Sequence, residues 1–276
     1  QAANDKKKQL PGKIIGGGCA TFSQHDIRSW DTTWFAFVLQ AEYAWGDPRP
    51  LDDELKSFTD KFAAVFYGAR DPEAAQVIAS AYRDLDAVKS DFERNNYLIR
   101  DFIGVYDLQD KSYLDNNLEA SLKLIDELAA KPQGPGKTIA DIRQRCDDAL
   151  KVAASSRQKL AGVASRVGNT GSMQHLISAP HKMENHARRT LFLLDLAAAF
   201  KSKDFANDDA QRAKLRKDSR ALIDDTRVIA DEMDLLMRGA RLHADAADPS
   251  GYHKAITSLE AFDKRLAEPG EPPEKR

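Results

Sequence analysis

Helical spacing of apolar residues from residue 51 onward is the feature that most constrains the fold. Apolar side chains recur every three or four residues between positions 52 and 67, and Gly68 follows them. The same spacing, interrupted by turns rich in Gly and Pro, predicts further helices over about 71–94, 112–130, 138–165, 181–200, 207–243 and 252–266. Only residues 13–22 resemble a strand. The sequence therefore predicts a mainly α protein whose helices pack as a bundle, because short turns favour antiparallel neighbours.

Three of the predicted helix starts carry local signals. Residues 71–73, Asp-Pro-Glu, offer an N-cap oxygen, a proline at the first helical position and an acidic first turn. Thr138 and Asp141 have the spacing of a capping box. Pro180 is interpreted as the start of the helix 181–200, because proline favours the first turn of a helix.

The charge balance and the cysteine count bound the function. The 41 basic and 43 acidic residues give a net charge of −2, so no global field favours nucleic acid or an anionic membrane. No run approaches the roughly 18 apolar residues of a membrane span. Cys19 and Cys146 are too few to form a metal site by themselves, and their pairing stays open. We predict no cofactor and no nucleic-acid partner.

Three histidines and one glutamate lie within twelve residues of one another, at His175, His181, Glu184 and His186. Zinc-binding helices present two histidines at positions i and i+4, whereas His181 and His186 are five apart and diverge around a helix. We therefore predict hydrogen bonding for these side chains and no metal site. The basic residues between 212 and 220 interleave with acidic ones, which is typical of a solvated helix face.

Residues 13–45 differ from the rest of the chain. They contain all three tryptophans and the Gly-Gly-Gly run. The strand-like residues 13–22 lead into a polar loop, and Asp31 and the threonines that follow it offer N-cap oxygens for an apolar helix over 34–45. That helix contains Trp34 and ends in Ala-Glu-x-x-Trp at 41–45.

This order of elements resembles the last βα unit of the barrel in glycoside hydrolase family 20, the β-N-acetylhexosaminidases. The counterparts are the glycine pair at 17–18, the strand end at 20–24, Trp34 and the motif at 41–45, within roughly 40 of the 276 residues. The resemblance implies a (β/α)8 barrel, whose active sites lie at the C-terminal ends of the strands. It implies carbohydrate contacts for residues in that place, namely Phe22, Gln24, His25 and Trp30.

Two departures from the family pattern fall in this site. The family's strand-end Trp, which helps wall the sugar pocket, is Phe22 here, and its Glu, which accepts hydrogen bonds from sugar hydroxyls, is Gln24. Phe keeps an apolar face for a pyranose, and Gln keeps a hydrogen-bonding end without charge. The family's catalysis depends on an Asp-Glu pair on an earlier strand, which acts with the substrate's own acetamido group. We therefore predict no catalytic residue here and no activity of this chain alone.

We predict three regions: a truncated barrel end at 1–50, a helical domain at 51–268 and a disordered tail at 269–276. The chain begins with Gln1, and we interpret it as the C-terminal fragment of a glycosidase, extracellular or periplasmic if the full-length protein carries a signal peptide. The alternative is a non-enzymatic helical interaction or scaffold module with helix-mediated self-association. The sugar and its linkage stay open.

Overall fold

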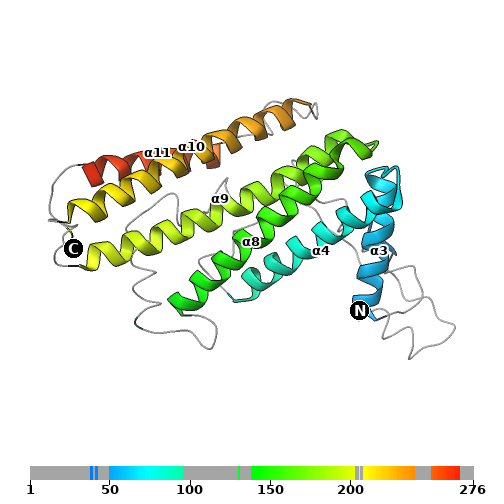
Figure 1. The fold of residues 1–276 in the computed structure, drawn as a ribbon, viewed down its shortest axis with the longest axis horizontal. Coiled ribbons are helices and arrows are strands. Elements are labelled where there is room, and N and C mark those ends of the chain that lie inside the picture. The colour runs from blue at the N-terminus through cyan, green and yellow to red at the C-terminus, as the bar shows by residue number, and fades with distance from the viewer. Residues whose placement is uncertain are drawn as a thin grey trace. The chain divides into compact units, whose positions relative to one another are not determined.

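The computed structural model describes residues 38–39, 41–42, 50–95, 130, 138–202, 205, 208–239 and 250–267. Within these ranges the chain is mainly helical, with no β-strand, which confirms the mainly α prediction. The helices are α3 (Leu51–Phe66), α4 (Pro72–Asn95), α8 (Ile139–Val163), the short 3-10 helix η2 (Ala164–Arg166), α9 (Thr170–Lys201), α10 (Asp209–Gly239) and α11 (Ser250–Ala267) (Figure 1). The strand predicted at 13–22 lies outside the described residues, and so does the helix predicted at 112–130 apart from Ala130.

The local signals at two helix starts act as predicted. The backbone N–H of Ala74 donates to Oδ1 of Asp71 at 2.9 Å, which caps α4. At α8 the N–H of Thr138 donates to Asp141 at 2.8 Å, and the N–H of Asp141 donates to the Thr138 hydroxyl at 3.1 Å. This reciprocal pair is a capping box with Asp in the acidic position. The hydrogen bonds from Thr138 lower the pKa of Asp141.

The predicted helix start at Pro180 is wrong. Helix α9 begins at Thr170 and continues through Pro180 to Lys201. Its cap is Asn169, whose side-chain oxygen accepts the N–H of Ser172 at 3.2 Å. Proline inside a helix lacks one N–H donor and costs about 3 kcal/mol. Pro180 is itself buried, so the packing of α9 outweighs that local cost.

The described residues divide into two compact units. Unit 1 comprises the described part of residues 1–84 together with residues 158–177. It contains α3, the first half of α4, the end of α8 and the start of α9. Aromatic rings fill much of its core: the rings of Phe62 and Phe66 stack at 4.6 Å, and the hydroxyls of Tyr67 and Tyr82 lie 2.6 Å apart.

Two turns that connect helices, far apart in sequence, lie against each other in unit 1. The turn after α3 and the turn before α9 are joined by an antiparallel bridge between Ala69 and Val167. The N–H of Arg70 donates to the carbonyl of Arg166 at 2.9 Å. Gly68 has a φ of 59°, in the left-handed region. The two glycines approach closely: a Cβ added to Gly168 would lie 3.9 Å from the Cα of Gly68. Backbone hydrogen bonds therefore join the two turns directly, which ties α3 and α4 to η2 and the start of α9 within unit 1.

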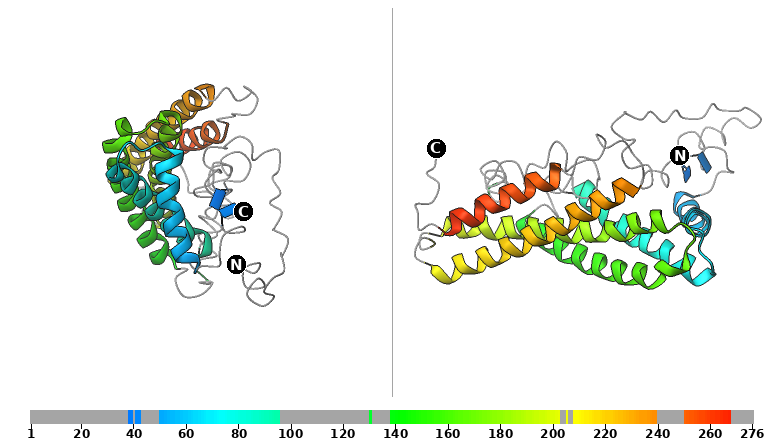
Figure 2. Two further views of the ribbon diagram at one scale, coloured as in Figure 1. Left: turned by 90° about the vertical axis from the view of Figure 1, so that its right-hand side faces the viewer. Right: turned by 90° about the horizontal axis from the view of Figure 1, so that it is seen from above.

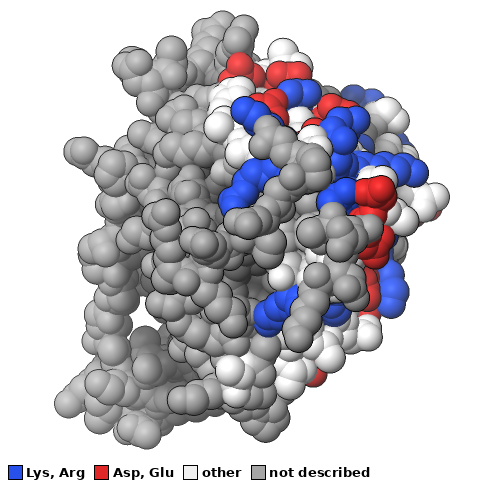
Figure 3. Space-filling view, turned by 90° about the vertical axis from the view of Figure 1, so that its left-hand side faces the viewer, with Lys and Arg blue, Asp and Glu red and all other residues white. Residues whose placement is uncertain are grey.

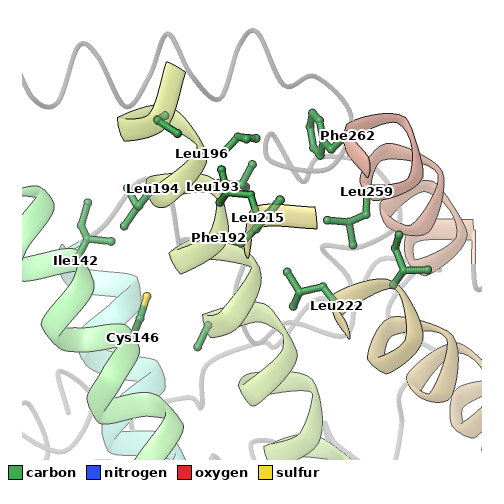
Figure 4. Packing of buried hydrophobic residues seen from close by; sticks show 14 of the residues in the cluster. Ile142, Cys146, Phe192, Leu193, Leu194, Leu196, Leu215, Leu222, Leu259 and Phe262 are labelled. Carbon is green, nitrogen blue, oxygen red and sulfur yellow. The ribbon is translucent and has the colours of Figure 1, made fainter. Parts of the chain in front are cut away.

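Unit 2 comprises the described part of residues 85–157 and 178–276. Its core takes side chains from α4, α8, α9, α10 and α11, including Ile142, Phe192, Leu222 and Phe262 (Figure 4). Within this unit α8 and α9 run antiparallel, as the ion pairs Arg143–Asp195 and Arg157–Glu184 show. Apolar side chains converge from five helices, so the bundle has a continuous core.

Helices α10 and α11 lie side by side and antiparallel in unit 2 (Figure 2). Arg216 near the start of α10 pairs with Asp263 near the end of α11, at 3.4 Å. Farther along, Ile229 of α10 packs against Tyr252 at the start of α11. The hydroxyl of Ser219 donates to the carbonyl of Leu259 at 3.2 Å, so a buried polar group on α10 is satisfied by α11.

We expect Gly68→Ala to lower the free energy of unfolding by about 1–2 kcal/mol, because an L residue with a Cβ is strained at positive φ. The added Cβ would come no closer than 3.5 Å to other atoms, so the cost is conformational rather than a clash. Gly162→Ala is the matched control: Gly162 lies in α8 with nothing within 4 Å. It should raise stability by about 0.5–1 kcal/mol. Urea denaturation of both variants gives the comparison, and an equal effect of the two would contradict this account.

Candidate functional site

Buried polar side chains are concentrated along the middle of α9 in unit 2. This stretch is covered by apolar and polar groups of α8 and α10, which both pair with it. Burial of a polar group costs free energy unless the group is hydrogen-bonded, so the partners of these side chains define the site. The buried polar residues are Ser178, His181, Glu184, Asn185, His186, Arg189 and Thr190.

The ring of His181 lies between two carboxylates of α10. Its Nε2 is 3.0 Å from Oδ1 of Asp225, and its Nδ1 is 3.1 Å from Oε2 of Glu232. Carboxylates only accept hydrogen bonds, and a neutral imidazole offers only one N–H. Both contacts are therefore hydrogen bonds only when the ring carries two protons. The hydrogen bond to Asp225 raises the pKa of His181 against the effect of burial, and Glu232 adds to the rise.

Asn185 completes this arrangement from the next turn of α9. Its amide nitrogen donates to Oδ2 of Asp225 at 2.8 Å and to the hydroxyl oxygen of Thr226 at 3.0 Å. The Thr226 hydroxyl in turn donates to the carbonyl of Leu222 at 2.6 Å. Burial acts to raise the pKa of Asp225, but the hydrogen bonds from His181 and Asn185 outweigh it and leave that pKa lowered. Each oxygen of the Asp225 carboxylate thus has its own partner on α9, His181 for Oδ1 and Asn185 for Oδ2.

Two further cations of α9 act on the same acids. Burial lowers the pKa of Lys182 to about 8, while the charge of Glu232 opposes that change. The charge of Arg188 contributes to the lowered pKa of Asp225. Three basic side chains of α9 thus balance two acids of α10, and His181 is the one that contacts both acids.

The pKa of His186, five residues along α9, is shifted in the opposite direction. A guanidinium can only donate, so Nη2 of Arg189, 3.0 Å away, makes Nδ1 of His186 the acceptor. Burial lowers the pKa of His186 well below its ordinary value, and the charge of Arg189 adds to this. The two histidines therefore differ: contacts with two acids of α10 raise the pKa of His181, whereas burial lowers the pKa of His186.

This arrangement is suited to holding helices together rather than to catalysis. A general base needs a free ring nitrogen within reach of its substrate, and both nitrogens of His181 face carboxylates. Among the described residues, no group of three His, Cys, Asp or Glu side chains is placed to hold a metal ion. The pKa of Cys146 is raised to about 12, chiefly by burial, so this thiol is not an activated nucleophile.

The sequence pattern singled out His181 but not its partners. His181 and Asn185 are four residues apart, and Asp225 and Glu232 are seven apart, so each pair lies on one helix face. These spacings are the signal that the sequence offers for a polar face on each helix. They do not show that the two faces meet, because Asp225 and Glu232 are 44 and 51 residues away from His181 along the chain.

The residues predicted to contact carbohydrate, Phe22, Gln24, His25 and Trp30, lie outside the described residues. Of the helix predicted at 34–45, the structure describes residues 38, 39, 41 and 42, and all four are helical. The carbohydrate site therefore stays a prediction. Of the Ala-Glu-x-x-Trp motif at 41–45, the structure describes the first two residues.

Charged residues of both signs alternate on the face shown in Figure 3, among the residues drawn in colour. The basic residues of α10 follow this pattern: Lys214 lies 3.7 Å from Asp218, and Arg220 lies 3.2 Å from Asp263. Exposed pairs of this kind contribute little stability, about 0–1 kcal/mol each. No helix in the described ranges is long and apolar enough to cross a membrane.

Comparison with known proteins gives no match to a family model, to a curated protein or to a solved structure.

We expect Cys146 to resist thiol reagents in the folded chain. The test uses the Cys19→Ser variant, in which Cys146 is the remaining cysteine. At pH 8 a thiol with a pKa of about 12 contains very little thiolate, so labelling should be roughly 100-fold slower or more than in urea. Fast labelling of the folded variant would show that Cys146 is accessible and ionised.

Proposed function

We propose that this chain is the C-terminal portion of a glycosidase resembling β-N-acetylhexosaminidases, and that its helices form a non-catalytic domain that braces the last helix of the barrel. The full-length protein would remove terminal N-acetylhexosamine residues by substrate-assisted hydrolysis. The observation that carries the bracing role is the contact of Glu42, in the Ala-Glu-x-x-Trp motif, with Lys61 of α3 at 3.0 Å.

The helical residues 39 and 42 both make contacts within unit 1. Leu39 packs against the apolar core of unit 1, and Glu42, three residues later, pairs with Lys61. Val38, in contrast, is 40% exposed. The exposed ion pair contributes at most about 1 kcal/mol, so the apolar contact of Leu39 is the larger part of this attachment.

The chemistry of the helices supports a non-catalytic role. His181, Asp225 and Glu232 are engaged with one another, and the buried Cys146 is protonated at neutral pH. In the proposed protein the general acid and its Asp partner belong to earlier barrel strands. The residues of this chain that contact the sugar would be Phe22, Gln24, His25 and Trp30.

A second candidate is the helical interaction module with self-association. Val228 and Leu235 of α10 are seven residues apart, so they lie on one helix face. Their exposed fractions are 50% and 70%, which favours this candidate. Sedimentation at several concentrations tests it: self-association that is lost in the double variant Val228→Ser, Leu235→Ser would support the module, and a monomer throughout would exclude self-association.

The activity test needs the complete reading frame. We expect the frame upstream of Gln1 to continue for some 300 codons and to include a strand ending in Asp-Glu, since a whole barrel takes about 250 residues. The full-length product should hydrolyse 4-nitrophenyl N-acetyl-β-D-glucosaminide, and residues 1–276 alone should not. A start codon directly before Gln1 would remove the glycosidase proposal and leave the helical module.

Gln24→Ala in the full-length protein should raise the Kd for N-acetylglucosamine by about ten-fold, the effect of losing one buried hydrogen bond to a sugar hydroxyl. Gln9→Ala removes the same side chain outside the matched motif and should leave the Kd unchanged. Isothermal titration calorimetry gives both values, and equal affinities in the two variants would contradict the placement of Gln24.

Leu39→Ala should lower the free energy of unfolding by about 2 kcal/mol, because it removes apolar contact with the core of unit 1. Val38→Ala changes the adjacent, more exposed residue and should alter stability by about 0.5 kcal/mol or less. Urea denaturation separates the two predictions. Equal effects would show that Leu39 does not attach its helix to the core of unit 1.

A further inference from the structure

We propose that His181, Asp225 and Glu232 form a proton-controlled latch between α9 and α10, closed while the ring of His181 carries two protons and open when it loses one. We define the latch as these three side chains. Its geometry carries the proposal: two carboxylates, which only accept hydrogen bonds, lie 3.0 and 3.1 Å from the two ring nitrogens.

Loss of one proton from His181 changes an attraction into a repulsion. The deprotonated nitrogen then presents a lone pair to a carboxylate oxygen about one hydrogen-bond length away. At the same time the two acids lose the cation that lies between them. An acceptor that faces another acceptor is unfavourable, and the penalty falls on the buried ring of His181, whereas the Glu232 side chain is 39% exposed and can turn toward water.

The opening should begin at Glu232. Asp225 remains bound to Asn185 and keeps the attraction of Arg188. Glu232 is two helical turns farther on, beside the described apolar cluster of Ile229, Ala230 and Tyr252, and its 39% exposed side chain is the less enclosed of the two acids. Glu232 is therefore the acid that can leave the ring first.

The sign of the pH dependence follows from the direction of each pKa shift. The pKa of His181 is raised on folding, so its stabilisation is complete below the unfolded value of about 6.5 and is lost as the pH rises through the folded value. The pKa of Lys182 is lowered to about 8. The free-energy cost of burying the charged Lys182 is therefore relieved only as the pH rises above about 8, so Lys182 makes the fold more stable at alkaline pH, whereas His181 makes it less stable. A loss of hydrogen-exchange protection in α10 at alkaline pH consequently cannot come from Lys182.

Hydrogen exchange of the whole chain at pH 6 and pH 9 tests the latch. After correction for the base-catalysed intrinsic rate, amides in the second half of α10 should lose protection by roughly ten-fold or more at pH 9, the effect of losing one charged hydrogen bond. Amides of α8 near the main core should keep theirs. Equal protection of α10 at the two pH values would overturn the proposal.

Glu232→Gln is the decisive variant. The introduced amide N–H can donate to Nδ1 of a neutral ring while Nε2–H still donates to Asp225, so the contact survives without the second proton. The pH response should disappear. Asp231→Asn is the matched control: it removes one negative charge at the neighbouring, exposed position and should leave the response intact. A response that persists in Glu232→Gln would exclude the latch.

Nitrogen NMR of the unmodified chain gives a second test, in which a variant serves only to assign the signals. At pH 6 both ring nitrogens of His181 should have the chemical shifts of protonated imidazolium, and His186 should show one protonated and one bare nitrogen. His181→Gln assigns the signals. A bare nitrogen on His181 at pH 6 would overturn the proposal, because the latch requires two donors.

Discussion

The organisation of unit 2 depends on one constraint: the polar side chains that α9 buries must find partners on the helices around it. An unpaired buried polar group costs about 1–3 kcal/mol, and a buried charge costs more. His181 and Asn185 meet this requirement through Asp225, and Glu184 meets it through Arg157 of α8. Such contacts fix the register of each helix pair, since a shift by one turn would separate a buried charge from its partner. The apolar core shown in Figure 4 stabilises the bundle but is less selective about register.

Local chemistry accounts for what the sequence predicted well. The caps at Asp71 and Thr138 use oxygens within three residues of the groups they bind, so their spacing is visible in the sequence. The mainly α fold follows in the same way from periodic apolar residues. Pro180 was misread because its local preference for a helix start is weaker than the packing around it. Here tertiary structure overrides a propensity of about 3 kcal/mol.

The candidate site could not be predicted because it consists of long-range pairs. Helical periodicity indicates which side of α9 His181 occupies, but it does not indicate that α10 lies on that side. The two pKa shifts depend further on tertiary contacts: the hydrogen bonds to Asp225 and Glu232 raise the pKa of His181, whereas burial lowers that of His186, although both residues lie on one helix. The proposed carbohydrate site and the proposed latch involve different residues. The first rests on a resemblance in residues 13–45 and on the contact of Glu42, and the second rests on the contacts of His181 in unit 2, so either can fail without the other.

The interlocked turns of unit 1 have a consequence for synthesis of the chain. Asp71 and Arg166, which pair across them, are 95 residues apart, a distance that a ribosome covers in about 5–20 s. During that time α3 and the first half of α4 have emerged without η2 or α9, and the rings of Phe58, Phe62 and Tyr67 lack part of their cover. Contacts so distant in sequence also form slowly, because a long loop must close first. The nascent chain thus exposes an aromatic surface for seconds, until the residues that cover it have been synthesised.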